Sequence, residues 1–269
     1  MKKNKLSIIF AILICICIFS VAAIADRCSY EALPTEEVDI EEAEEEYVQQ
    51  PEKEVEEQES AQEEEQKETP AIESAVYDEQ EIEYFFETAL GTEFGTSQPI
   101  IHKWTDNIRI KINGTPTGTD LDSLGQVIAE LNSLIGSITF DIVTRNSNID
   151  IYFTAVDQFA SIEPGYVPGN MGFFWVWWDN TGAIYKGKVL IAIDGISQQE
   201  RSHLIREELT QSLGIMNDSY RYKDSIFYQE WTDTINYAPI DRTIISLLYD
   251  PRLKPGMTQD QVRNVLDIH

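Results

Sequence analysis

The sequence predicts an α+β domain over residues 76–269, the last of three segments of contrasting composition. Two observations lead to this fold class. Apolar alternation typical of strands is concentrated in the middle of the segment, and helical patterns with capping residues precede and follow it. Strands grouped between helices favour a mixed, mostly antiparallel twisted sheet. We expect this sheet to pack on a long N-terminal helix and on a later helix that carries a motif, with another helix at the C-terminus.

The strands are predicted from periodicity and from the turns between them. Ile108–Ile112 alternates strictly between apolar and charged residues, as a half-buried strand does, and Asn113-Gly114 is typical of a turn. Asp179–Gly182 has the composition of a turn between two longer strands. The predicted strands are 108–112, 138–143, 149–153, 173–178 and 184–193.

The helices are predicted from their caps and their apolar stripes. Asp120 or Asp122 can cap a helix that runs to about Leu134. Ser197-Gln198-Gln199-Glu200 is a capping box, and Gly214 is a typical stop for the helix that follows it. The predicted helices are 77–90, about 120–134, 197–214, 241–249 and a last one that begins after Thr258.

Residues 1–25 have the features of an export signal. Lysines at positions 2, 3 and 5 precede an apolar run, and Ala23-Ile24-Ala25 offers a small-x-small cleavage site. The run is about long enough to span a bilayer, so an uncleaved anchor is the alternative. In both cases we expect an extracellular or cell-surface protein whose membrane contact is limited to this segment.

Residues 26–75 are predicted to be a disordered acidic linker. Within them, residues 31–75 hold 19 acids and two lysines, a net charge of −17 out of the chain's −27. Such a segment buries too little apolar surface to order itself, and its self-repulsion suits a spacer. The overall acidity excludes nucleic acid as a partner, because phosphate requires clustered Lys and Arg.

The cysteines exclude a disulfide-stabilised domain. If the signal is cleaved after Ala25, Cys28 is the single cysteine that remains. One thiol forms no internal disulfide, so the domain must be stabilised by its core, and no zinc site can rest on one cysteine. A bridge to another molecule through Cys28 stays open, although we expect a monomer.

The most informative motif is Glu207-Glu208-Leu209-Thr210-Gln211, followed by Gly214 and Asn217. It has the spacing of a zinc-protease helix, in which H-E-x-x-H is followed by x-x-G-x-x-H/D. At about 100° per residue, Glu207 and Gln211 fall on one helical face, one turn apart. Glu208 lies where a general base belongs in a metalloprotease, so we name it as the candidate catalytic residue.

This motif and the order of the elements resemble the metzincin class of zinc proteases over roughly residues 100–269. Ser246–Tyr249 is similar to the Met-turn of that class, with Leu248 in the place of the methionine. A closer resemblance is to an uncharacterised bacterial family, domain of unknown function 2927, carried by Arg206–Gly214, Asn217–Ser219 and Leu248–Met257. That resemblance implies a metzincin-like fold with a degenerate motif.

The departures from the zinc motif leave the cofactor open. The resemblance assigns Glu207, Gln211 and Asn217 to the three ligand positions, and His203 lies near the same face as a fourth candidate. Zinc prefers His, Cys and carboxylate, whereas a carboxylate with two amides suits calcium better. One divalent metal, zinc or calcium, and no metal at all are both open. The alternative for each residue is structural: a capping histidine, carboxylates paired with arginine, and amides that satisfy loop backbone.

The run Phe173–Trp178 is unusually aromatic. Alternation places Phe173, Trp175 and Trp177 on one face and Phe174, Val176 and Trp178 on the other, as in a strand covered on both sides. In a metzincin-like layout this strand lies at the cleft edge, where a substrate backbone can pair with it. We therefore name two tryptophans of this strand, Trp175 and Trp177, as candidate substrate-binding residues that can stack on a sugar ring or an apolar side chain. The third candidate substrate-binding residue is Tyr249.

Three functions follow from these features. The first is a metal-dependent peptidase that uses Glu208 as its base. The second is a degenerate peptidase homologue that binds peptide without cutting it. The third is a module that binds cell-wall glycan through its tryptophans.

Overall fold

The structure of the protein is a computed structural model that describes residues 77–90 and 99–267. These residues belong to one compact unit of α+β architecture. The predicted signal or anchor at 1–25, the acidic linker at 26–75 and Cys28 lie outside the described residues. None of the helices in the described ranges combines the length and apolarity needed to cross a membrane.

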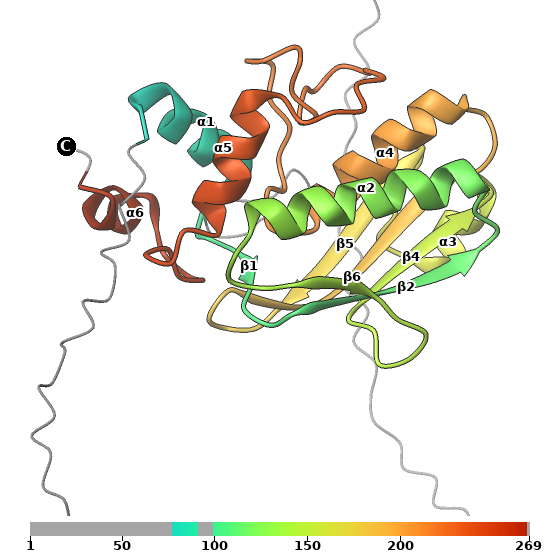
Figure 1. Ribbon diagram of the computed structural model, residues 1–269, viewed down its shortest axis with the longest axis horizontal. Coiled ribbons are helices and arrows are strands. Elements are labelled where there is room, and N and C mark those ends of the chain that lie inside the picture. Colours follow the sequence, from blue (N-terminus) through green and yellow to red (C-terminus); the bar gives the residue numbers. More distant parts are fainter. Residues whose placement is uncertain (1–76, 91–98, 268–269) are drawn as a thin grey trace, which may run out of the picture. The chain divides into compact units, whose positions relative to one another are not determined.

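Within the part of the chain that the structure describes, the sheet has six strands, and most of its pairs are parallel (Figure 1). The strands are β1 (Lys103–Trp104), β2 (Ile108–Gly114), β3 (Phe140–Ile142), β4 (Ile149–Thr154), β5 (Gly172–Trp178) and β6 (Ala183–Ala192). Parallel pairing runs through β3, β2, β4 and β6, and β1 pairs in parallel with the start of β6. The expectation of a mostly antiparallel sheet is therefore wrong, since β5 with β6 is the one antiparallel pair among these named strands.

The connections explain the direction of the strands. A helix of 17 residues lies between β2 and β3, and a crossover of this length returns the chain to the same end of the sheet. By contrast, β5 and β6 are joined by a short turn in which the Asp179 carboxylate accepts the backbone N–H of Thr181 and of Ala183. A short turn reverses the chain, so this pair alone of the named strand pairs is antiparallel.

The described residues also form six α-helices around the sheet, and the predicted caps at Ser197 and Thr258 are confirmed. The cap predicted at Asp120 or Asp122 is wrong, because Thr117 caps that helix and the Asp120 carboxylate accepts the Thr117 backbone N–H. The helices are α1 (Glu79–Ala89), α2 (Gly118–Leu134), α3 (Phe159–Ile162), α4 (Gln198–Gln211), α5 (Pro239–Leu248) and α6 (Gln259–Val265), with a short 3-10 turn at Val156–Gln158.

The helices other than α3 divide into two groups. Figure 1 shows α2 and α4 side by side over one face of the sheet, while α1, α5 and α6 gather at one end of it. The main core lies between these helices and the sheet. A smaller cluster of Phe159, Phe173, Leu190 and Ala192 covers part of the opposite face beneath α3. The aromatic strand β5 is thus packed on both faces, as its composition predicts.

The end of α4 is fixed to distant parts of the chain. The Trp104 indole N–H donates to the Ser212 carbonyl at 3.0 Å, and the Tyr249 hydroxyl donates to the Leu213 carbonyl at 3.1 Å. Gly214 then turns the chain with a φ of 121°. Because these contacts come from β1 and from the end of α5, α4 is held rigidly against the sheet.

Candidate functional site

A cleft of about 270 Å³ opens between α4, β5 and the segment 228–232. The α4 side contributes His203, Leu204 and the motif residues, and the β5 side contributes the strand and the loop in front of it. The lining residues are Gly169–Val176, Trp178, His203, Leu204, Glu207, Glu208, Gln211, Met216, Asp218 and Tyr228–Thr232. Among the described strands, β5 pairs with β6 alone, so the cleft lies beside the edge strand of the sheet.

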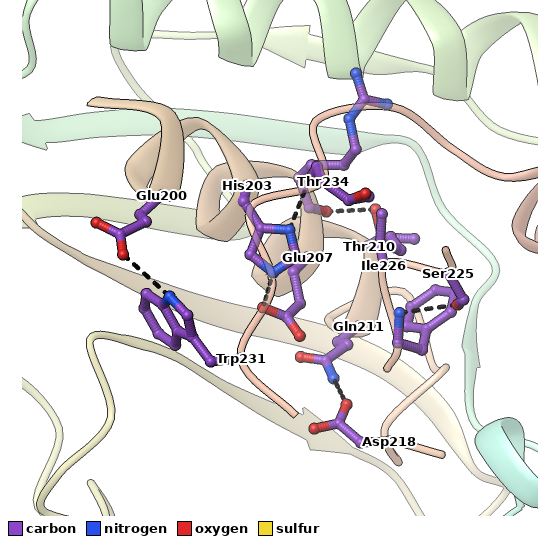
Figure 2. Close-up of polar contacts among 12 residues, drawn as sticks. Glu200, His203, Glu207, Thr210, Gln211, Asp218, Ser225, Ile226, Trp231 and Thr234 are labelled. Carbon is purple, nitrogen blue, oxygen red and sulfur yellow. Dashed lines mark hydrogen bonds and ion pairs between the residues drawn. The ribbon is translucent and has the colours of Figure 1, made fainter. Parts of the chain in front are cut away.

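His203 is held between two acceptors at the floor of the cleft (Figure 2). Its Nδ1 lies 2.6 Å from the Thr234 carbonyl oxygen, which fixes Nδ1 as a donor, and its Nε2 lies 3.1 Å from Oε2 of Glu207. The ring is 4 % exposed. Both ring nitrogens therefore already have partners, and the ion pair joins two residues one turn apart on α4.

The surroundings of His203 favour its protonated form. Burial disfavours the charged ring, but the hydrogen bond and the negative charge of Glu207, together with the Thr234 carbonyl, outweigh burial and raise the pKa of His203 above its ordinary value. Glu207 and Thr234 belong to α4 and to the segment after the cleft wall. Protonation of His203 thus strengthens the attachment of that segment to α4.

We predict that the stability of the domain falls as pH rises through the folded-state pKa of His203. A raised pKa means that the folded state binds the proton more tightly than the unfolded state. This stabilisation is complete below the unfolded-state pKa of about 6.5 and is lost as pH rises through the folded-state pKa. Urea unfolding between about pH 5.5 and pH 8.5 measures the slope. Glu207→Gln should flatten this part of the profile, and an unchanged slope in that variant would refute the assignment.

Glu208 lines the cleft with its carboxylate against the backbone of β5. It is 7 % exposed, and a Cβ added to Gly172 would lie only 2.3 Å from its Oε1. Glycine at position 172 is therefore what gives the Glu208 carboxylate its room. The candidate base is therefore placed in the cleft, next to the edge strand β5.

Gln211 and Asp218 form a second polar pair at the cleft. The Gln211 amide Nε2 donates to Asp218 Oδ1 at 2.7 Å, and the Gln229 amide reaches the other oxygen at 3.4 Å. Figure 2 shows the Gln211 amide pointing toward Asp218, which comes from the chain after the Gly214 turn. Asp218 directly follows the third motif position, but the spacing of the motif does not single it out.

Asn217 does not join this cluster. Its side-chain amide donates to the carbonyl oxygens of Glu87 at 3.4 Å and Leu90 at 3.2 Å, and its backbone N–H donates to Thr88. Asn217 thus caps the C-terminal end of α1 instead of facing Gln211. The amide satisfies loop backbone, which is the structural alternative stated for it above.

The tryptophans selected from the sequence lie mainly on the far face of β5. Trp175 stacks on Phe173, with ring centroids 6.2 Å apart, and contributes to the smaller cluster, although it also borders the cleft. Trp177 does not line the cleft and instead lies beneath the ammonium groups of Lys186 and Lys188. The aromatic side chains of β5 that pack on the α4 side are Phe174 and Trp178.

Tyr249 is also away from the cleft. It is 4 % exposed, and the Lys103 ammonium lies 4.9 Å from the centre of its ring. Burial raises the pKa of its hydroxyl above the ordinary range. With that hydroxyl bonded to the Leu213 carbonyl, Tyr249 supports the end of α4 and is not placed to touch a ligand in the cleft.

The segment Tyr228–Thr232 forms a wall that sequence reasoning missed. Trp231 is 56 % exposed at this wall, and its indole N–H donates to Glu200 of α4 at 3.0 Å. No strand or helix pattern marks the segment, and its composition resembles that of an ordinary surface loop. The signal available in the sequence was a tryptophan that lies outside any periodic stretch.

The residues at the motif positions do not fit a catalytic zinc. A zinc ligand needs a free nitrogen, sulfur or carboxylate directed at a shared point. Here His203 is engaged at both nitrogens, Gln211 directs its amide nitrogen to Asp218, and Asn217 faces α1. Within the described ranges, no three His, Cys, Asp or Glu side chains gather closely enough to hold a metal ion. The calcium alternative fails similarly, because the oxygen set of Glu207, Gln211 and Asn217 is not assembled.

Comparison with known families identifies the domain. Residues 78–268 match the family described as "Protein of unknown function (DUF2927)", which is most of the chain. The chain belongs to the DUF2927 family. No curated protein matches its sequence.

Two solved structures are similar to this DUF2927 chain at low identity. "Structure of myroilysin" is 13 % identical, with a TM-score of 0.35, and the match covers 56 % of this chain and 97 % of that one. "Crystal structure of myroilysin" is 12 % identical, with a TM-score of 0.38, and the match covers 62 % and 93 %.

Proposed function

We propose that this DUF2927 domain is a degenerate, metzincin-like peptidase homologue that binds an extended peptide in the cleft without a catalytic metal. The observation that carries the proposal is the position of the cleft, between the edge strand β5 and the helix α4, whose motif residues Glu207 and Gln211 are bonded to His203 and Asp218. On this proposal the domain keeps the peptide-binding part of a peptidase site and lacks the catalytic part. The spacing of the motif on α4, the turn at Gly214 and the final helix α6 support the metzincin-like description.

The edge strand supports peptide binding. A strand that is paired on one side offers backbone N–H and C=O groups to an extended peptide, which then becomes one more strand. β5 is seven residues long and pairs with β6 alone among the described strands. Phe174 and Val176 line the cleft beside it and supply apolar contacts for alternate side chains of the ligand.

The internal bonds of the motif residues support the absence of metal chemistry. His203 with Glu207 and Gln211 with Asp218 satisfy one another, as in a structural network. Breaking both pairs to bind a cation would expose buried donors and acceptors to a penalty of roughly 1–3 kcal/mol for each lost partner. A network of this kind is stable without a metal.

We predict peptide binding without cleavage. Purified full-length protein, titrated with a fluorescent library of blocked extended peptides, should bind members with apolar side chains at alternate positions. Phe174→Ala should weaken that binding by about tenfold, because it removes an aromatic wall of the cleft. Tyr185→Ala, which removes an exposed aromatic from β6 outside the cleft, is the matched control and should leave binding unchanged.

Two further measurements decide between a binding module and a peptidase. Mass spectrometry of the incubated library should show no new termini, and elemental analysis should show no stoichiometric zinc or calcium. A tightly held metal, together with cleavage that Glu208→Gln abolishes, would establish the peptidase and overturn the proposal. If none of the peptides bound, the proposal that the cleft binds peptide would be wrong.

One observation favours glycan binding as the second candidate. Trp231 is exposed at the cleft and Tyr228 lies beside it, and an exposed aromatic ring next to acidic side chains can stack on a sugar. Retention on purified peptidoglycan tests this candidate, with Trp231→Ala as the variant. Retention that this variant abolishes would favour the glycan over the peptide.

We also propose that the domain works outside the membrane, at the cell surface. The support is the signal-like sequence of residues 1–25 and the acidic segment that follows it. Fractionation of cells that produce the full chain tests this location, and recovery in the cytoplasm with an intact N-terminus would contradict it.

A further inference from the structure

We propose that the cleft receives a lysine or arginine side chain of the bound peptide. This inference rests on the proposed function and specifies the ligand class of the same site. Four carboxylates line the cleft, from Glu207, Glu208, Asp218 and Glu230, and the one basic side chain among the lining residues is His203, which is paired with Glu207. Three carboxylates therefore remain in excess over positive charge. A wall with this charge attracts a cation and disfavours an acidic side chain.

The shape and the apolar walls of the cleft suit a long side chain with a charged tip. Its volume of about 270 Å³ lies just below the usual range of about 300–1,000 Å³ for small-molecule pockets, so it accommodates a side chain more readily than a large ligand. Met171, Phe174 and Leu204 form apolar surface beside the carboxylates. The methylene stem of lysine or arginine packs on such surface while its head group reaches the acids.

The arrangement of the carboxylates points to a hydrogen-bonding cation and not to a bare metal ion. In the described structure Glu207 is oriented by His203, and Asp218 is oriented by the amides of Gln211 and Gln229. Carboxylates fixed in this way present acceptor oxygens at separate points of the wall. An ammonium or guanidinium group carries several N–H donors and can satisfy separated acceptors, whereas a metal needs them at one point.

The test compares peptides that differ at one side chain. Full-length protein is titrated with a blocked alanine pentapeptide that has lysine, norleucine or glutamate at its centre. Norleucine keeps the apolar stem and lacks the charge. The lysine peptide should bind at least about tenfold more tightly than the norleucine peptide, as expected for a hydrogen bond to a charged group, and the glutamate peptide should bind weakest. The difference should shrink as salt is added.

Two variants test whether the carboxylates of the cleft cause the preference for lysine. Glu208→Gln and Asp218→Asn should each reduce the ratio of the affinity for the lysine peptide to the affinity for the norleucine peptide. Asp122→Asn removes the same charge from an exposed position on α2 that does not line the cleft and should change nothing. Circular dichroism and thermal unfolding of each variant show whether it is folded.

The results with the three peptides distinguish a failure of this inference from a failure of the proposed function. Binding of the norleucine peptide with equal or weaker binding of the lysine peptide would overturn the inference and keep the peptide-binding cleft. No binding of any of the three peptides would overturn both. A lysine preference that survives both cleft variants would place the cation elsewhere and would also overturn the inference.

Discussion

Gly214→Ala is expected to destabilise the domain by about 3–5 kcal/mol, because neither its backbone conformation nor its surroundings accept a side chain. Gly214 has a φ of 121°, which L-residues with a Cβ rarely adopt. A Cβ at this position would lie 1.9 Å from the His102 carbonyl oxygen and 3.4 Å from a methyl carbon of Leu248. The carbonyl belongs to backbone beside β1 and cannot move away without disturbing the sheet.

Thermal unfolding measures this effect. For a domain of this size, a loss of several kcal/mol lowers the melting temperature by roughly 10 °C or more. Gly125→Ala is the matched control, since Gly125 lies within α2 and has no atom near the position of an added Cβ. Alanine is the better helix former, so this control should be neutral or more stable by up to about 1 kcal/mol. Equal melting temperatures for the two variants would disprove the prediction.

The helix boundaries could be predicted because their causes are local. Ser197 and Thr258 bond to backbone groups three residues away, and such short-range chemistry is visible in the sequence. The cap of α2 was assigned to Asp120 or Asp122, and Thr117, which lies between Pro116 and Gly118, was not selected. In the structure Asp120 is the other half of the Thr117 capping box.

Strand direction could not be predicted from the strands themselves. Direction depends on which distant strands pair, and the alternation in Ile108–Ile112 is the same for either orientation. The helix between β2 and β3 was the informative feature, because a helical crossover joins parallel strands. Grouping the strands by their nearness in sequence obscured that crossover.

The candidate site was predicted in part. The helical spacing brought His203, Glu207, Glu208 and Gln211 to one cleft, because residues three or four apart share a helical face. The same reasoning fails beyond Gly214, where Asn217 faces α1 and Asp218 faces the cleft. The direction of a side chain after a sharp turn depends on tertiary contacts, and so does the position of the wall at Tyr228–Thr232.

Asp241→Ala is expected to cost about 3–5 kcal/mol of unfolding free energy, because it leaves several buried donors without an acceptor. The Asp241 carboxylate is fully buried. One oxygen accepts the Ser225 hydroxyl at 2.6 Å, and the other accepts the backbone N–H groups of Ile226 at 3.1 Å and Ala238 at 2.8 Å. The carboxylate therefore joins the start of α5 to the segment that continues into the cleft wall.

Asp241 also has a predictable pH dependence. Burial outweighs its hydrogen bonds and raises the pKa of this carboxyl to about 6. A raised pKa means that folding takes up a proton, so this contribution is complete below about pH 4 and is lost as pH rises through about 6. Asp241→Asn, which does not titrate, should remove this part of the profile in urea unfolding at about pH 5 and pH 7.

The comparison with Ser225→Ala identifies which bonds matter most. The Ser225 hydroxyl also contacts the Tyr84 hydroxyl at 2.8 Å and accepts the Phe227 N–H, so it is the link from Asp241 toward α1. Ser225→Ala leaves both backbone donors on Asp241 and should cost less than Asp241→Ala, by about 1 kcal/mol or more. If the two variants were equally unstable, the hydroxyl chain, and not the backbone cap of α5, would be what holds the cleft wall in place. If Asp241→Ala unfolded at the wild-type urea concentration, the buried carboxylate would have no structural role.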